Sequence, residues 1–143
     1  MTTVAQVLKT KEAHVYTIAP NASVRSAIKL MAEKNIGALI VINEQNKVVG
    51  IISERDYTHK VVLKDRSSLT TNVDQIMTSN VLTVTRSMKV EECLQMMTDG
   101  HLRHLPVVED EKLLGMVAIG DLVKAAMEDQ RLLIQQLQHY ISG

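Results

Sequence analysis

Short apolar runs alternate with amphipathic stretches along the first half of the chain. Ser23 precedes Val24–Lys34, where apolar side chains recur at helical spacing, so we predict a helix there with Ser23 as its N-cap. A second helix is predicted from Ser53 to about Leu63. Three short runs of apolar and β-branched residues predict strands: Val15–Ile18, Ala38–Ile42 and Lys47–Ile52.

The second half predicts the same order of elements. A helix near Val90–Asp99 is broken at Gly100, and a final helix begins near Ile119 and continues to about Tyr140. Three strands are predicted at Val81–Val84, Leu105–Val108 and Leu113–Val117. The final helix is longer than its counterpart in the first half. Its extension carries an apolar stripe that is expected to pack on the chain's own body or on a second copy: Ala126, Leu133, Leu137 and Ile141.

The two halves repeat each other at a nearly constant offset. Ala38–Ile42 is echoed by His104–Val108, and the leading segment Val4–Leu8 by Val73–Met77. A unit used twice usually packs against its own copy, because neither half can bury its apolar face alone. We therefore predict an α/β (α+β) fold of two β-α-β-β-α repeats, residues 1–66 and 67–143, related by a pseudo-twofold axis. Ligand pockets favour junctions of this kind.

Composition and charge narrow the function only slightly. The chain has 143 residues, the size of one ordinary domain. Lys plus Arg equals Asp plus Glu at 16 each, which gives no support for a nucleic-acid or membrane-surface partner. Cys93, the only cysteine, is expected to be a buried core residue rather than a nucleophile. The chain lacks the pattern of a membrane span or a signal peptide, so a cytoplasmic location is expected.

The segment Gly50–Asp56 joins the end of a predicted strand to the start of a predicted helix. The first N–H groups of a helix are unpaired and favour an anion. Ser53 adds a hydroxyl, Arg55 adds a charge suited to phosphate, and the Asp56 carboxylate can accept hydrogen bonds from two vicinal ribose hydroxyls. The same spacing of Ser53 and Asp56 is also close to a helix capping box, which needs no ligand.

A second copy of this motif, Gly115–Asp121, keeps the acidic residue but not its neighbours. Asp121 recurs at the equivalent position, whereas Ala118 and Gly120 replace the hydroxyl and the charged residue. An aspartate without the serine is poorly explained by a reciprocal cap, although its charge near a helix start would still be stabilising. We expect two similar sites with unequal affinity.

These motifs resemble those of a tandem pair of cystathionine β-synthase (CBS) domains, often called a Bateman module. The resemblance is carried by the two Gly-to-Asp segments and by the runs Ile36–Val41 and Leu102–Val107, and it covers the chain from Val4 to about Ala126. It implies that the two repeats pack through their sheets and that pairs of such modules dimerise, so a homodimer is expected. It also implies adenosine-containing ligands in clefts between the repeats.

Carried over residue by residue, the resemblance implies that each cleft joins the Asp motif of one repeat to the first strand of the other. Arg103 and His104 would lie near the phosphates, and Lys60, on a solvated helix face, could reach a polyphosphate. The first cleft would combine Asp121, Ala118 and Gly120 with Thr17, Ala22, Gly37 and Ala38. The second would combine Asp56, Ser53 and Arg55 with Thr83, Met88, Leu105 and Pro106.

The leading hypothesis is a regulatory module that senses an adenine nucleotide (AMP, ADP, ATP or NAD(H)) and transmits its state to an unknown partner protein. No spacing typical of a catalytic triad or a phosphate-binding loop is present, so an enzyme is not expected. Two alternatives remain open at this stage. One is a structural module that only dimerises through the final helix. The other is a metal- or redox-linked regulator built on Cys93, His101 and His104.

Overall fold

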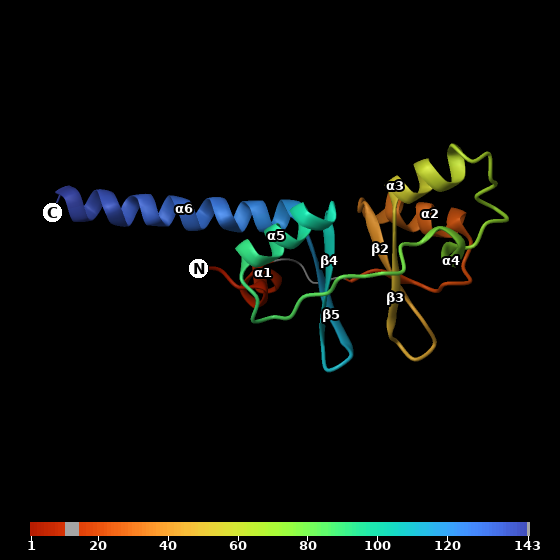
Figure 1. The fold of residues 1–143 in the computed structure, drawn as a ribbon, viewed down its shortest axis with the longest axis horizontal. Coiled ribbons are helices and arrows are strands. Elements are labelled where there is room, and N and C mark those ends of the chain that lie inside the picture. Colours follow the sequence, from red (N-terminus) through yellow and green to blue (C-terminus); the bar gives the residue numbers. More distant parts are fainter. Residues whose placement is uncertain (11–14, 143) are drawn as a thin grey trace. The chain divides into compact units, whose positions relative to one another are not determined.

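The computed structural model describes residues 1–10 and 15–142 (Figure 1). Strands β1, β2 and β3 form one small sheet, and β4 and β5 form another, which confirms the predicted mixed α/β class. Across the two described ranges, no helix has the length and apolar character needed to cross a bilayer. The elements, in chain order, are α1 (Val4–Thr10), β1 (Thr17–Ile18), α2 (Val24–Lys34), β2 (Ala38–Ile42), β3 (Val48–Ser53), α3 (Glu54–Tyr57), the π-helical turn η1 (Thr58–Val62), α4 (Val73–Ile76), α5 (Val90–Gly100), β4 (His104–Glu109), β5 (Lys112–Ala118) and α6 (Ile119–Ser142).

The described residues separate into two compact units. The β1–β3 unit contains residues 15–82 and 110–113, and the β4–β5 unit contains residues 1–10, 83–109 and 114–142. The two repeats follow one another along the sequence, yet each leading segment belongs to the unit of the other repeat. Helix α1 therefore lies in the β4–β5 unit, and α4 lies in the β1–β3 unit.

Equivalent hydrogen bonds hold the two leading segments. In the β4–β5 unit, Val4 N–H donates to the Met88 carbonyl at 2.9 Å and Val90 N–H donates to Thr2 at 3.0 Å. Both valines are fully buried in a core that also contains Cys93. Because α1 is short, these backbone bonds and its buried side chains, rather than helix propensity, fix its position.

The same arrangement recurs at α4. Val73 N–H donates to the Ala22 carbonyl at 2.8 Å, and Val24 N–H donates to Thr71 at 2.9 Å. Val73 and Ile76 of α4 are buried in the core of the β1–β3 unit, beneath α2 and the sheet. The internal repeat seen in the sequence thus extends to the hydrogen bonds that close each unit.

In the β1–β3 unit, β1 pairs with β2 in parallel and β2 pairs with β3 in antiparallel order. The helix predicted at Val24–Lys34 is confirmed, and so is its cap, since Ser26 N–H donates to the Ser23 hydroxyl oxygen at 3.1 Å. Asn35 ends the helix in the left-handed conformation, which a short polar side chain tolerates. The strand predicted at Ala38–Ile42 is also confirmed, and its first four residues are buried.

The strand predicted at Val81–Val84 is wrong. Only Val84 forms a bridge, in parallel with Val107 of β4, where Val84 N–H donates to the Pro106 carbonyl at 3.0 Å. Val84 is buried, but Leu82 and Thr83 are exposed. A single anchored side chain does not hold a longer edge strand, because each ordered residue costs conformational entropy that burial must offset.

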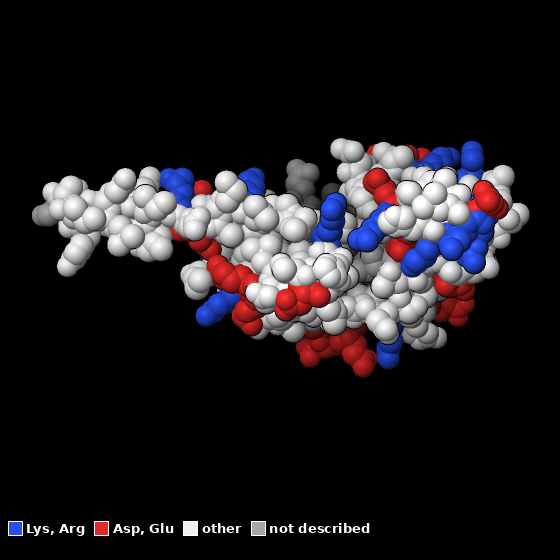
Figure 2. Space-filling view, turned by 45° about the horizontal axis from the view of Figure 1, so that its top comes forward, with Lys and Arg blue, Asp and Glu red and all other residues white. Residues whose placement is uncertain are grey.

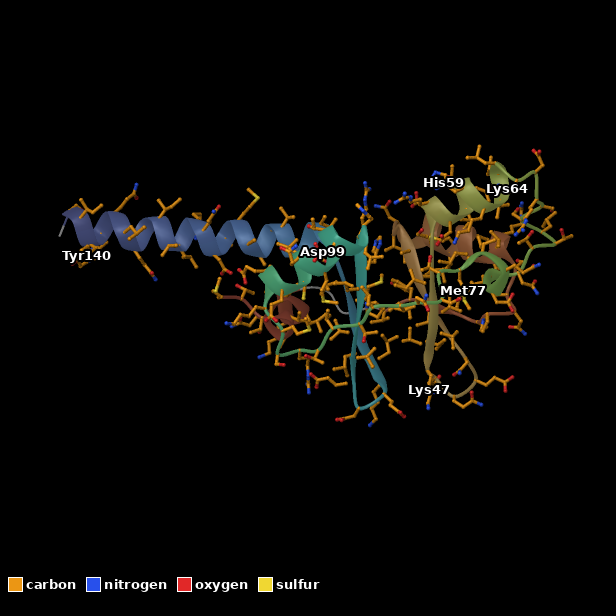
Figure 3. The ribbon with its side chains drawn as sticks, in the orientation of Figure 1. Lys47, His59, Lys64, Met77, Asp99 and Tyr140 are labelled. Atoms are coloured by element: carbon orange, nitrogen blue, oxygen red, sulfur yellow. The ribbon has the colours of Figure 1, made fainter. Side chains whose placement is uncertain are left out.

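The helix predicted from Ser53 to about Leu63 is divided. Helix α3 ends at Tyr57, and the chain continues as η1, where Leu63 N–H donates to the Thr58 carbonyl at 3.1 Å. His59 lies on this turn and Lys64 just after it (Figure 3). The equivalent helix of the second repeat, α6, instead runs without interruption for 24 residues. Single π-helical turns are rare and frequently lie at functional sites.

Candidate functional site: two acidic helix starts

Asp56 lies at the start of α3, where β3 ends at Ser53. Ser53 N–H donates to Asp56 Oδ2 at 2.9 Å, and the Ser53 hydroxyl donates to the same oxygen at 3.1 Å. In return, Asp56 N–H donates to the Ser53 hydroxyl oxygen at 3.2 Å. The capping box considered from the sequence is therefore present, and Asp56 within it is only 9% exposed.

Lys60 provides the second contact to this carboxylate. Its Nζ lies 2.9 Å from Asp56 Oδ1 and donates to the Ile76 carbonyl of α4 at 2.8 Å. The spacing of Asp56 and Lys60, four residues apart, is the one that brings helical side chains together. The lysine therefore neutralises the carboxylate and ties η1 to the leading segment. This spacing was visible in the sequence, but the tertiary bond to Ile76 was not.

Asp121 occupies the same place in the β4–β5 unit, at the start of α6. Ala118 N–H donates to Asp121 Oδ2 at 2.9 Å, which reproduces the backbone bond of the first motif. Ala118 supplies no hydroxyl, and Ala125 stands at the position equivalent to Lys60. Asp121 is half-buried. The second site thus shares the backbone geometry of the first but has neither its serine nor its lysine at the equivalent positions.

In each unit, the residue just before β2 or β4 accepts a hydrogen bond from the start of the acidic helix. Glu54 N–H donates to the Gly37 carbonyl at 3.1 Å, and Ala38 pairs in register with Ser53. In the other unit, Ile119 N–H donates to the Arg103 carbonyl at 2.9 Å. Each unit therefore has the same backbone hydrogen bond, from the first residue of the acidic helix to the residue just before β2 or β4.

The other predicted site residues are distributed between the two units. In the β1–β3 unit, Thr17 lies on β1 and Arg55 is exposed on the first turn of α3. In the β4–β5 unit, Gly120 is exposed on the first turn of α6. Thr83 is exposed, Met88 and His104 are half-buried, and Leu105 and Pro106 are buried. Each cleft implied by the resemblance draws one set of residues from each unit, so its assembly stays a prediction.

The carbonyl groups of Ala22 and Met88 already accept hydrogen bonds from the leading segments. Each lies in the loop before a repeat's first long helix. These two backbone positions are therefore structurally equivalent anchors. Any contact that Ala22 or Met88 makes with a ligand is therefore expected to come from their side chains.

The residues considered for a metal site do not gather. Cys93 is fully buried on α5, where burial raises the pKa of its thiol and the charges of Glu92 and Glu91 raise it further. His101 ends α5 in the left-handed conformation. Within residues 1–10 and 15–142, no group of three or more His, Cys, Asp or Glu side chains is placed to hold a metal ion. The buried thiol fits the core role expected from the sequence.

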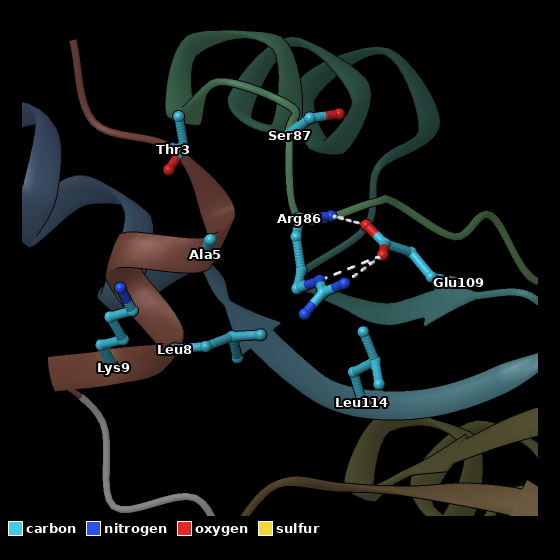
Figure 4. A pocket seen from close by; sticks show the side chains of 8 residues that line it. All are labelled: Thr3, Ala5, Leu8, Lys9, Arg86, Ser87, Glu109 and Leu114. Carbon is cyan, nitrogen blue, oxygen red and sulfur yellow. Dashed lines mark hydrogen bonds and ion pairs between the residues drawn. The ribbon is translucent and has the colours of Figure 1, made fainter.

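An open pocket of about 730 Å³ lies on the β4–β5 unit, between α1 and the start of β5 (Figure 4). Arg86 crosses it and donates to Glu109 at 2.7 and 3.0 Å, and these hydrogen bonds lower the pKa of the Glu109 carboxyl. None of the predicted site residues lines this pocket. Its lining consists of Thr3, Ala5, Leu8, Lys9, Arg86, Ser87, Glu109 and Leu114.

Two equivalent acidic helix starts, each following a short strand, define a tandem-repeat α/β protein. The model for the family described as CBS domain matches residues 4–62 and 73–128. The chain therefore belongs to the CBS-domain family and carries the domain twice, which confirms the resemblance read from the Gly-to-Asp segments. CBS-domain pairs are regulatory modules.

Known proteins similar to this chain support the same assignment. A solved protein with CBS domains from Burkholderia ambifaria MC40-6 is 50% identical, with a TM-score of 0.85, over 90% of this chain and 96% of that one. The mitochondrial CBS domain-containing protein CBSX3 of Arabidopsis thaliana is 40% identical over 99% of this chain and 73% of that protein. The CBS domain pair of protein MJ0100, solved with methylthioadenosine and S-adenosyl-L-methionine, is 25% identical, with a TM-score of 0.80, over 90% of this chain and 98% of that one.

Proposed function

We propose that this chain is a regulatory module that binds an adenine nucleotide through the carboxylates of Asp56 and Asp121 and transmits the bound state to a partner protein. The observation that carries the proposal is the repeated geometry at the two helix starts. In each, a backbone N–H holds one carboxylate oxygen at 2.9 Å, so the carboxylate is oriented before a ligand arrives.

The chemistry of a ribose suits these helix starts. A carboxylate offers about four acceptor positions, so an oriented Asp can accept both hydroxyls of a vicinal diol while keeping its bond to the backbone. Phosphate groups next to the ribose would meet the positive end of α3 or α6. The MJ0100 pair binds two ligands that contain adenosine, which supports the same ligand class here.

The remaining contacts are expected to come from the opposite repeat, as the resemblance implies. Adenine would lie on aliphatic side chains, because the chain contains no Phe or Trp. Arg55, Arg103 and His104 are the expected phosphate contacts, and Lys60 would have to leave Asp56 to take part. That exchange would make the first site respond to phosphate number.

Regulation requires that the ligand bind one conformation of the module more tightly than another. Closure of two repeats around a shared ligand is the simplest such change. The partner would then recognise one state. This proposal needs no reacting bond, so the module is not expected to be an enzyme.

Calorimetric titration tests the proposal. AMP, ADP, ATP, NADH and S-adenosyl-L-methionine are titrated separately into the wild-type chain, with 2′,3′-dideoxyadenosine monophosphate as the matched control for AMP. We expect binding by at least one of the ribose-bearing ligands and at least tenfold weaker binding of the dideoxy compound, since about 1.4 kcal/mol corresponds to tenfold. No heat with any ligand, or equal affinity for the dideoxy compound, would reject the role given to the two carboxylates.

A further inference from the structure

The connector between η1 and α4, residues 63–72, presents two leucines to solvent on a backbone that is held in place. Leu63 and Leu69 are 66% and 65% exposed. The connector is anchored at its start, where Arg66 N–H donates to the carbonyl of the buried Val61 at 3.0 Å. Large apolar side chains that a fixed backbone presents to water, with polar residues around them, indicate an interaction surface.

The other end of the connector is anchored to α2. Arg25 N–H donates to the Ser68 carbonyl at 3.0 Å, and Val24 N–H donates to the carbonyl of the buried Thr71 at 2.9 Å. Arg25 and Lys29 stand four residues apart on α2, so their side chains lie on the same face of the helix. The first turn of α2 therefore lies against the connector, with Arg25 beside it and Lys29 one turn further on.

The leucines of the connector stand among cations. Figure 2 shows lysine and arginine side chains gathered over part of the β1–β3 unit. Four exposed cations belong to α2 and the connector, and within residues 1–10 and 15–142 none of the four is part of an ion pair. Together with the two leucines they form what we call the connector surface: Arg25, Lys29, Leu63, Lys64, Arg66 and Leu69.

The second repeat does not carry this charge. At the positions equivalent to those of the two α2 cations, it has Glu91 and Gln95. Asp129 is equivalent to Lys64, and its carboxylate accepts hydrogen bonds from Thr2. The same fold thus forms with acidic or neutral side chains at these places, so folding does not account for the cations of the first repeat.

The connector surface begins where the first acidic helix start ends. Lys60 Nζ lies 2.9 Å from Asp56 Oδ1 and donates to the Ile76 carbonyl at 2.8 Å. Leu63 N–H donates to the Thr58 carbonyl at 3.1 Å, which closes the π-helical turn that carries this lysine. A ligand that draws Lys60 away from Asp56 would therefore act on the turn from which the connector surface begins.

We propose that the connector surface binds an acidic segment of the partner protein, one that also carries apolar side chains. The four cations attract and orient the acidic side chains, and Leu63 and Leu69 supply the apolar area that a protein interface buries. This inference rests on the proposed function, because it names the chemistry of the partner. The surface contains neither Asp56 nor Asp121, so it is tested without nucleotide.

Three other occupants fit the surface less well. Asp65 lies between two of the cations, and the continuous negative charge of an anionic bilayer would repel it, whereas a protein can place its acids against the cations alone. None of the six residues is aromatic, so the bases of a nucleic acid would find no side chain to stack on. In a second copy, Asp129 and Glu128, the acids of the equivalent surface, are engaged within their own unit.

Fluorescence anisotropy with synthetic peptides tests the proposal. The probe is a short labelled peptide of glutamate and leucine, and a peptide of lysine and leucine is its control. We expect the wild-type chain to bind only the first, and Lys64→Glu with Arg66→Glu to weaken this binding at least about tenfold, because two attractions become repulsions. Lys112→Glu with Lys124→Glu makes the same change in net charge at exposed positions outside the surface and should change the affinity less than about twofold. Equal melting temperatures verify that both double variants are folded.

Leu63→Ser with Leu69→Ser measures the apolar contribution separately. It is expected to weaken binding of the glutamate–leucine peptide at least about tenfold, since two apolar contacts are lost. Binding of a glutamate–serine peptide, which has no apolar side chain to bury, should be weaker and equal for this variant and wild type. Unchanged binding of the glutamate–leucine peptide to the variant would contradict the role of the two leucines.

Several results would overturn the proposal. One is no binding of the glutamate–leucine peptide, and another is equal weakening by the two charge-reversed variants. Binding to phosphatidylserine vesicles without binding of the peptide would assign the surface to a membrane. Self-association that only Lys64→Glu with Arg66→Glu disrupts, measured by sedimentation velocity, would assign it to a second copy. A failed peptide experiment beside a positive nucleotide titration would reject this surface and leave the proposed function standing.

Discussion

The two acidic helix starts have the same backbone geometry and different electrostatic surroundings. Asp56 and Asp121 each accept one backbone N–H at 2.9 Å from the residue three positions earlier. Asp56 also binds the Ser53 hydroxyl and the Lys60 ammonium, whereas the corresponding positions of the second repeat are Ala118 and Ala125. The two repeats thus share the backbone bond that orients the carboxylate and differ in the residues at the positions of Ser53 and Lys60.

This difference has a consequence for binding. A ligand at Asp56 competes with the ion pair to Lys60, whereas the position equivalent to Lys60 in the second repeat is Ala125. Lys60 is also bound to the Ile76 carbonyl of α4, so displacing it would disturb the leading segment. We therefore expect the two sites to differ both in affinity and in what their occupation does to the rest of the unit.

The largest effect is expected from removing the first carboxylate. Asp56→Ala leaves the Ser53 N–H and the Lys60 ammonium without their partner, and we expect a loss of about 2–3 kcal/mol in the free energy of unfolding. Asp121→Ala removes the bond from the Ala118 N–H, with no serine hydroxyl at that position, and should cost about 1 kcal/mol. Urea denaturation measures both. Equal losses would show that the electrostatic difference between the two starts has no energetic weight.

The leading segments provide a comparison in which the two units should agree. Val4 and Val73 are both fully buried and make equivalent backbone bonds. Val4→Ala and Val73→Ala are each expected to reduce the free energy of unfolding by about 2 kcal/mol, through lost burial and the cavity left behind. Urea denaturation of the two variants checks this. A loss at only one of the two positions would contradict the equivalence of α1 and α4.

Exchanging the capping residues should make the stabilities of the two helix starts more similar. Ser53→Ala removes the hydroxyl that caps α3 and should cost about 1 kcal/mol, as lost N-caps do. Ala118→Ser is the reciprocal change and should stabilise the chain by a smaller amount, because a serine at this position can accept the Asp121 N–H. Thermal unfolding of both variants measures the pair. A higher melting temperature for Ser53→Ala than for wild type would contradict the view that the Ser53 hydroxyl stabilises the start of α3.

Removing Lys60 isolates the ion pair. The lysine side chain is 43% exposed, so Lys60→Ala is expected to cost only about 0.5 kcal/mol, with much of the effect screened by salt. Unfolding in urea at low and high salt measures this difference. Lys64→Ala, which removes an exposed lysine just after η1, is the matched control. An identical response of the two variants to salt would mean that the Asp56 contact contributes nothing specific.

The smallest effect is expected at Glu109. Its ion pair with Arg86 has no counterpart at the equivalent positions of the first repeat. Arg86 hydrogen bonds lower the pKa of Glu109, and the first repeat has Pro20 and Asn43 at the equivalent positions. A lowered pKa in the folded state gives stability that is fully present above the ordinary pKa of about 4.3. It is lost as the pH falls through the folded value. Glu109→Gln should therefore be slightly less stable than wild type at pH 7 and equal to it in acid, by urea midpoints; a pH-independent difference would contradict this.

Local patterns predicted the elements that local chemistry determines. Helix α2 and strand β2 agree with their predicted bounds because a Ser cap, helical spacing and a continuous apolar run act within a few residues. The prediction of a strand at Val81–Val84 was wrong because only Val84 is buried and paired with another strand. The π-helical turn after α3 was missed for a related reason, since Lys60 contacts a carbonyl that lies 16 residues away.

The tertiary packing of the elements was harder to predict from the sequence. The repeated leading segments were recognised, but nothing in Val4–Leu8 or Val73–Met77 states which repeat each will join. Their exchange between units follows from hydrogen bonds to distant loops. The candidate site was likewise predicted only in part. The sequence identified both acidic helix starts and the capping box, whereas the neutralisation of Asp56 through η1 required the folded chain.

A crystal structure of the chain with bound AMP tests the central proposal most directly. We expect the 2′- and 3′-hydroxyls of the ribose to lie within hydrogen-bonding distance of the carboxylate of Asp121, of Asp56, or of both in separate sites. AMP bound with its ribose remote from both carboxylates, for example in the pocket beside Arg86, would contradict the proposal.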